Sequence, residues 1–203
     1  NTLPTASATN TGPYCVGATI QLNSVGGSAT DDWSGPSSYS VTNVQNPTIP
    51  ASTVAMDGVY TVTVTDINSC SATATTTVVV SPLPAPTATN TGPYCVGSTI
   101  QLNSPTGYAT DDWTGPLSYT ATNIQNPTIA SSTVAMSGDY TVTVTAPGGC
   151  SATATTTVVV NALPTPTASN TGPYCEGSTI QLNSPTGSAT DDWSGPSSYS
   201  VVN

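Results

Sequence analysis

The sequence repeats itself with a period of 80 residues, and this repeat most limits how the chain can fold. The tripeptide Pro-Tyr-Cys and a single tryptophan return at the same spacing. The copies lie at residues 13–15, 93–95 and 173–175, and at Trp33, Trp113 and Trp193. Because neighbouring copies are nearly identical, each should form the same small structure. We expect units at residues 1–82 and 83–162 and the front part of a third at 163–203, as an excerpt of a longer array.

One stretch of each unit predicts a central β-strand. Between Gly58 and Thr65, valines alternate with threonines, which is the period of a strand with one buried face. Tyr60 follows Gly58 by two residues, and the same pattern returns around Tyr140. This pattern is typical of a tyrosine corner, in which the ring is buried and the hydroxyl bonds to the backbone a few residues upstream. A tyrosine that only fills the core is the alternative.

The rest of each unit predicts further short strands and no helix. In the first unit we expect them at residues 4–10, 19–23, 28–33, 39–42, 46–49, 52–56 and 71–80, with a turn at 25–27. About seven short strands separated by turn residues predict an Ig-like sandwich, with Trp33 and its copies as core anchors. The fold class is therefore all-β, as tandem Ig-like (PKD-like) β-sandwich repeats. The linker at 81–86 is proline-rich and should act as a semi-rigid spacer.

The charge composition excludes several functions. The 203 residues include no Lys, Arg or His and ten acidic residues, for a net charge of −10. Basic residues supply most of the affinity for phosphate backbones and for anionic membranes, so neither nucleic acid nor a membrane surface is expected as a partner. No run approaches the roughly 20 apolar residues that span a bilayer, so no membrane insertion is expected. No His or Lys is present to activate the serines and threonines, so we expect no catalytic residues and no enzyme.

Each complete unit has two cysteines, and the third unit has one. They are Cys15 and Cys70, Cys95 and Cys150, and Cys175. Two cysteines per module without histidine indicate disulfides in an exported protein rather than zinc sites, and free buried thiols are the alternative. We expect a bond within each unit, which would contribute about 4 kcal/mol. In an Ig-like sandwich the two positions belong near opposite ends, so a bond from Cys15 to Cys150 of the next unit stays open.

Two adjacent aspartates stand directly before each tryptophan. The pairs in the complete units are Asp31 with Asp32 and Asp111 with Asp112. Neighbours in a strand face opposite ways, so a pair cannot act together as acid and base. Calcium is the better hypothesis, since hard cations bind several carboxylate and carbonyl oxygens. Against it, Asp57 and Asp66 have no acidic counterpart in the second unit, and we expect no cofactor. Asp31 should lie on the face of Trp33, where a carboxylate is costly unless another group bonds to it.

Two stretches of each unit resemble known repeats. Residues 58–70, Gly-Val-Tyr-Thr-Val-Thr-Val-Thr-Asp-Ile-Asn-Ser-Cys, resemble the SprB-type repeats of gliding-motility adhesins of Bacteroidota. Within residues 13–36, Pro-Tyr-Cys-Val-Gly, Ile-Gln-Leu and Trp-Ser-Gly-Pro resemble the Ig-like modules of the same giant surface proteins. The resemblance covers nearly all of each unit and brings no catalytic residues. It implies a long exported surface protein, typically secreted by the type IX route. The aspartate pair, where such modules often have Tyr-Ser, and the lack of basic residues depart from the group.

Two functions agree with these observations. The first is structural, in which tandem sandwiches with stiff linkers and disulfides form an extracellular stalk or filament of a bacterial surface protein. Its partners would be neighbouring repeats of the same chain, and other copies in a filament. The second is direct adhesion, in which loops near Trp33 or Tyr39 bind a glycan or a partner cell. Copies this alike favour spacing over a specialised binding tip, so we expect the structural role.

Overall fold

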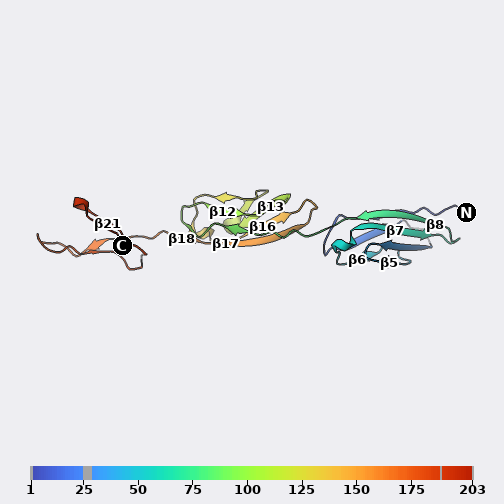
Figure 1. The fold of residues 1–203 in the computed structure, drawn as a ribbon, viewed down its shortest axis with the longest axis horizontal. Helices are drawn as coiled ribbons and strands as arrows, with labels where there is room; N and C mark the ends of the chain where they lie inside the picture. The colour runs from blue at the N-terminus through green and yellow to red at the C-terminus, as the bar shows by residue number, and fades with distance from the viewer. Residues whose placement is uncertain (1, 25–28, 188, 203) are drawn as a thin grey trace.

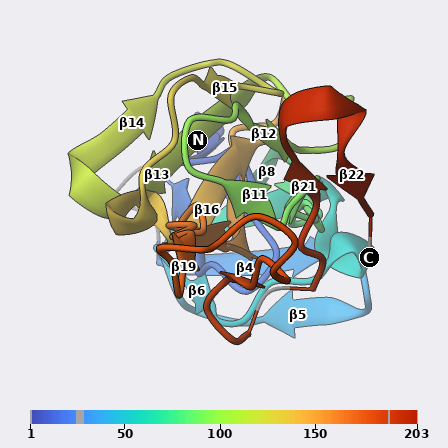
Figure 2. The same cartoon turned by 90° about the vertical axis from the view of Figure 1, so that its left-hand side faces the viewer.

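The structure is a computed structural model that describes residues 2–24, 29–187 and 189–202. Two β-sandwiches and a shorter C-terminal segment follow one another in a row, with the N-terminus at one end (Figure 1). Figure 2 shows the row end-on, with the C-terminal segment nearest the viewer. The expected turn at 25–27 lies outside the described residues. Among the described residues, no helix is long and apolar enough to cross a membrane.

The first sandwich consists of two sheets and a short edge pair. The four-stranded sheet has the order β5 (Tyr39–Val41), β4 (Thr30–Gly35), β7 (Gly58–Thr65) and β8 (Ser71–Val78). The three-stranded sheet has the order β1 (Ala8–Asn10), β3 (Ile20–Ser24) and β6 (Thr48–Ile49). The edge pair is β2 (Tyr14–Cys15) with β9 (Val80–Ser81), in parallel. This strand order, with the first strand divided between the sheets, is that of an Ig-like sandwich, so the predicted fold is confirmed.

The second sandwich repeats the first, element by element. Its sheets are β14 (Tyr119–Ala121), β13 (Thr110–Gly115), β16 (Gly138–Thr145) and β17 (Ser151–Val158), then β10 (Thr89–Asn90), β12 (Ile100–Asn103) and β15 (Thr128–Ile129), with the parallel pair β11 (Tyr94–Cys95) and β18 (Val160–Asn161). The C-terminal segment has β19 (Ser169–Asn170), β20 (Leu182–Asn183), β21 (Trp193–Ser194) and β22 (Ser200–Val201). Short 3-10 helices lie at η1 (Val54–Met56), η2 (Pro116–Ser118), η3 (Val134–Met136) and η4 (Pro196–Ser198).

Two expected strands are wrong in detail, for identifiable reasons. The stretch 52–56 belongs to none of the sheets in the described residues, and its last three residues form η1 instead. The stretch 71–80 divides into two strands. β8 pairs with β7, whereas β9 pairs with β2 instead. The Asp57 carboxylate accepts a hydrogen bond from the Val80 N–H at 2.9 Å, beside the start of β9.

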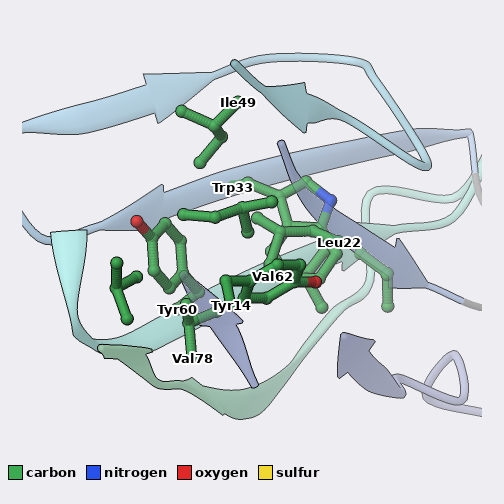
Figure 3. Close-up of a cluster of buried hydrophobic side chains, with 10 residues drawn as sticks. Tyr14, Leu22, Trp33, Ile49, Tyr60, Val62 and Val78 are labelled. Atoms are coloured by element: carbon green, nitrogen blue, oxygen red, sulfur yellow. The ribbon is translucent and has the colours of Figure 1, made fainter. Parts of the chain in front are cut away.

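The central strand β7 has the register that the sequence predicts. It pairs with β4, where Val62 lies opposite Trp33, and with β8 on its other side. Tyr60, Val62 and Val64 are fully buried, while the threonines between them are half-buried. Figure 3 shows the Trp33 and Tyr60 rings in one cluster with Leu22 and Val62. The alternation of valine and threonine therefore determines which face of β7 lies in the core.

The predicted tyrosine corner is present in both sandwiches. The Tyr60 hydroxyl donates a hydrogen bond to the Met56 carbonyl at 3.1 Å, and Tyr140 donates one to Met136 at the same distance. A Cβ at Gly35 would collide with the Tyr60 ring, so only glycine fits there. Burial, and to a lesser extent the neighbouring Tyr39, raises the pKa of the Tyr60 hydroxyl, so it stays protonated and able to donate up to a higher pH than an exposed tyrosine.

Replacing the corner tyrosines by phenylalanine should destabilise both sandwiches. Tyr60→Phe combined with Tyr140→Phe keeps the rings but leaves the Met56 and Met136 carbonyls without their donors. We expect the free energy of unfolding to fall by about 1–2 kcal/mol per sandwich, as measured by urea denaturation. The matched control is Tyr39→Phe with Tyr119→Phe, whose hydroxyls make no hydrogen bond among the described residues. An equal loss in the control would show that the corner hydroxyl is not the cause.

Candidate functional site

The two sandwiches meet at a covalent junction, which is the candidate functional site. One side is the parallel pair of β2 and β9, from which the chain leaves the first sandwich; we call this pair and its copy, β11 and β18, the exit edge. The other side is the turn between β16 and β17, at residues 146–150. We call this turn and its copy at 66–70 the rear turn.

The exit edge forms because a short polar sequence carries the first strand from one sheet to the other. The Asn10 side chain donates hydrogen bonds to the Thr76 hydroxyl at 2.8 Å and the Thr77 carbonyl at 2.9 Å. Its carbonyl oxygen accepts a hydrogen bond from the Gly12 N–H at 2.9 Å. After the cis peptide bond between Gly12 and Pro13, β2 runs beside β9. Cys15 therefore lies next to Ser81, where the chain enters the linker.

Tyr14 holds this crossing in place. Its hydroxyl donates a hydrogen bond to the Gln21 carbonyl at 3.0 Å and accepts one from the Gln21 N–H at 3.1 Å. It also accepts a hydrogen bond from the Thr11 N–H at 3.0 Å. A Cβ at Gly12 would come within 2.6 Å of the Tyr14 ring, so the ring lies directly against the glycine backbone. The crossing thus depends on a small residue followed by an aromatic one.

The rear turn is tight and lies directly against the exit edge. The Ala146 N–H donates to the Cys150 carbonyl at 2.8 Å, and the Gly149 N–H donates to the Ala146 carbonyl at 2.8 Å. Gly149 has a φ of +83°, which favours glycine. A Cβ at Gly148 would lie 2.6 Å from the Ser81 hydroxyl oxygen of the first sandwich. The two sandwiches therefore touch through small side chains and backbone.

A disulfide between Cys15 and Cys150 joins the two sides. The two Cα atoms are 5.6 Å apart, within the range that disulfides need, and 135 positions separate the residues in sequence. Cys150 is fully buried, whereas its copy Cys70 is half-buried. Cys15 is half-buried, whereas its copy Cys95 is exposed. The Cys150 sulfur lies 3.8 Å from the Ser81 carbonyl oxygen. Each bonded cysteine is thus more buried than its unbonded copy.

The expected bond within each unit is wrong, and the alternative linkage to the next unit is the one present. Strand β8 runs from the rear turn to the exit edge, and its eight residues span roughly 26 Å. That distance exceeds by far the roughly 7 Å that a disulfide allows between Cα atoms. Cys70, Cys95 and Cys175 are free thiols in the described part of the chain.

The aspartate pairs are engaged in the fold of each sandwich. Asp31 is buried and accepts a hydrogen bond from the Ser24 hydroxyl at 2.6 Å, which answers how a carboxylate is tolerated beside Trp33. Asp32 faces the other way and accepts one from the Asn43 N–H at 2.9 Å. In the second sandwich Asp111 accepts from Ser104, and Asp112 accepts from Asn123 at 2.8 Å.

The calcium hypothesis for these residues gains no support from their positions. The two carboxylates of each pair lie on opposite faces of one strand, and each is bonded to a different neighbour. Among the described residues, no group of three His, Cys, Asp or Glu lies close enough together to hold a metal ion. The carboxylates of the other acidic candidates accept hydrogen bonds from the backbone. Asp57 accepts one from the Val80 N–H, and Asp66 accepts two from N–H groups of its own turn.

The predicted core anchors differ between the complete sandwiches and the C-terminal segment. Trp33 and Trp113 are buried, and each indole N–H donates to a glutamine carbonyl at 3.2 Å. Trp193 is only half-buried and lines a hollow of about 700 Å³ with Ile180 and Leu182. Their copies in the second sandwich, Ile100, Leu102 and Trp113, are buried in one cluster with valines of β16. The hollow is therefore the open core of a partial sandwich rather than a ligand pocket.

Sequence reasoning missed Asn10, Tyr14 and Gly148 as residues of the junction. The signal for the first two was present, since the hexapeptide Asn-Thr-Gly-Pro-Tyr-Cys is identical at 10–15, 90–95 and 170–175. A strictly repeated polar segment indicates a fixed local geometry rather than an ordinary turn. Gly148 has no such signal, because the first unit has Asn68 at that position.

No model of a known protein family matches the chain, and no curated protein matches its sequence. Among solved structures it is similar to murine CEACAM1b, with 14% identity, a TM-score of 0.45 and coverage of 78% of this chain and 100% of that one. It is also similar to three N-terminal domains of the bacteriophage RB49 outer capsid protein Hoc, with 15% identity, a TM-score of 0.37 and coverage of 97% and 77%. These likenesses concern the fold and nothing finer.

Removing the junction disulfide should destabilise the chain. Cys150→Ser releases the loop between residues 15 and 150, which increases the conformational entropy of the unfolded state. We expect the free energy of unfolding to fall by roughly 2–4 kcal/mol, as measured by denaturant unfolding without reductant. The matched control is Cys70→Ser, the same substitution in the other rear turn, which should change it by less than about 0.5 kcal/mol. A loss of equal size in both variants would contradict the assigned linkage.

Proposed function

We propose that this chain is part of a stalk or filament of an exported surface protein, in which disulfide-linked Ig-like units provide length and stiffness. The observation that carries the proposal is the bond between Cys15 and Cys150, because it joins two folded units rather than stabilising one. A bond in that place fixes how neighbouring units are oriented. An array built to hold its units in line is a structural element.

The junction has two covalent connections instead of one. The linker leaves the first sandwich after Ser81, and the disulfide leaves it at Cys15, which is the partner of Ser81 in the parallel pair. On the second sandwich they arrive at different places, because the linker leads into β10 while the disulfide reaches the rear turn. A single proline-rich linker limits bending only partly. A second connection at a separate point also opposes rotation and bending about the linker.

A disulfide also supports an extracellular location. Such bonds persist in oxidising compartments and are rare in the cytosol, where thiols are kept reduced. The resemblance of residues 13–36 and 58–70 to repeats of giant bacterial surface proteins supports the finer proposal, namely a cell-surface protein of the gliding-motility type, secreted by the type IX route. Direct binding of a glycan or partner cell remains the alternative function, and no feature of the described residues favours it over the structural role.

Electron microscopy of the cells that make the protein tests this function. Gold-labelled antibodies against the chain should mark thread-like or stalk-like material outside the cell envelope. The comparison is the same cells with the gene for the chain deleted, which should lose both the label and the threads. Label confined to the cell interior, or threads that persist after deletion, would contradict the proposal.

Pulling on single molecules tests whether the junction carries load. When both ends of the chain are pulled, the disulfide diverts the force from Cys15 to Cys150 and shields the 135-residue loop. At about 3.4 Å per residue, complete unfolding should lengthen the oxidised chain by roughly 46 nm less than the reduced chain. Cys150→Ser should behave like the reduced chain without any reductant, and Cys70→Ser should behave like the oxidised one. Equal lengthening in all forms would exclude a load-bearing bond.

A further inference from the structure

Both halves of the junction are present in both sandwiches, although only one pair of the cysteines that the structure describes is bonded. At the exit edge of the second sandwich, Tyr94 pairs with Val160 and Cys95 with Asn161, as Tyr14 and Cys15 pair in the first. The hydrogen bonds agree as well, since the Tyr94 N–H donates to the Val159 carbonyl at 2.9 Å, as the Tyr14 N–H does to the Val79 carbonyl. The Tyr94 hydroxyl also donates to the Gln101 carbonyl at 3.0 Å. Cys95 is thus held as Cys15 is, but its side chain is exposed.

The rear turn of the first sandwich repeats that of the second. The Asp66 N–H donates to the Cys70 carbonyl at 2.9 Å, as the Ala146 N–H does to Cys150. Ser69 has a positive φ of 63°, where Gly149 has one of 83°. The Asp66 carboxylate accepts two further hydrogen bonds, from the N–H groups of Asn68 and Cys70, both at 2.8 Å. The turn therefore presents Cys70 in the geometry of Cys150, although the side chains of the turn differ.

Neither Cys70 nor Cys95 has a disulfide partner within its own sandwich. Cys95 and Cys150 lie at opposite ends of the eight-residue strand β17, as Cys15 and Cys70 lie at opposite ends of β8. In addition, Cys150 is already bonded to Cys15. What Cys70 and Cys95 each lack is the complementary half of a junction. Cys95 lacks a rear turn placed beyond it, and Cys70 lacks an exit edge placed before it. A further copy of the same repeat contains both.

We propose that Cys95 forms a disulfide with the rear-turn cysteine of a repeat that follows the second sandwich, and that Cys70 forms one with the exit-edge cysteine of a repeat that precedes the first. The partner is thus another Ig-like unit of this kind, joined head to tail. Each unit would then be bonded to both of its neighbours, and successive disulfides would overlap along the array. This inference rests on the proposed array and specifies how its units are connected.

The bond forms by oxidation of two thiols. The two sulfurs each lose a hydrogen and join, while the two electrons and two protons pass to a small-molecule disulfide such as oxidised glutathione. The glutathione disulfide bond breaks and yields two reduced glutathione molecules. The same reaction accounts for the bond between Cys15 and Cys150.

A chain extended by one half-unit tests the Cys95 bond. A copy of residues 124–162 appended after residue 203 completes a third unit and adds a copy of Cys150. After refolding with a glutathione redox buffer at low protein concentration, we expect two disulfides, Cys15 to Cys150 and Cys95 to the appended cysteine. Chymotrypsin, which cleaves after aromatic residues and leucine, separates the cysteine peptides, and mass spectrometry without reduction identifies the linked pairs. Two alkylatable thiols, Cys70 and Cys175, should remain.

The matched control is Cys95→Ser in the extended chain. It should lose one disulfide and have three alkylatable thiols, while the bond from Cys15 to Cys150 is unchanged. A free Cys95 in an extended chain that has formed the bond from Cys15 to Cys150 would overturn the proposal, as would a bond of Cys95 to any other cysteine. The stalk function would survive that result, since the microscopy of cells tests it separately.

A second variant keeps the proposal testable if the appended half-unit does not fold. A copy of residues 1–80 placed before residue 1 supplies a complete preceding unit of the kind that the structure contains. Cys70 should then bond to the added copy of Cys15, and Cys95 should stay free. Cys70→Ser in this chain should leave that copy alkylatable. A free Cys70 beside an intact bond from Cys15 to Cys150 would overturn the proposal for the rear turn.

Discussion

The parallel pairing of β2 with β9 is the interaction on which the rest of the molecule depends. It brings a residue near the start of each repeat beside the residues at its end, so Cys15 lies next to Ser81 although 66 positions separate them. The pairing requires the crossing at residues 10–15, where Asn10 and Tyr14 supply the hydrogen bonds and Gly12 leaves room for the ring. Without this crossing, the cysteine could not face the following sandwich.

The two copies show which parts of the repeat tolerate change. Asp57 in the first sandwich and Ser137 in the second do the same work, since each accepts a hydrogen bond from the N–H group at the start of the last strand. Asp66 supports its turn with a carboxylate, whereas the corresponding turn uses a glycine at positive φ. Position 57 varies because a hydroxyl oxygen can accept the same backbone hydrogen bond as a carboxylate. Gly35 and Gly115 do not, because any Cβ would collide with a buried tyrosine.

The sequence predicts the sandwich well and the junction poorly, for a physical reason. Alternation in β7 determines the buried face, and the upstream glycine with Tyr60 indicates the corner, because both signals are local. The Ig-like fold already places the two cysteines of a unit near opposite ends, but the position of Cys15 beside the linker depends on a two-residue strand, β2, that is too short to leave a periodic pattern. The hydrogen bond from Ser24 to Asp31 is equally non-local, so the burial of that aspartate could be anticipated but its partner could not.

The bond between Cys15 and Cys150 also gives the backbone a second covalent route. A single peptide bond broken anywhere between these residues leaves the two parts of the chain in one molecule, since the disulfide still connects them. The nicked region includes most of both sandwiches, whose hydrogen-bonded strands would hold the cut ends near each other. Such a protein can sustain a cut without being severed, which an unlinked string of domains cannot do.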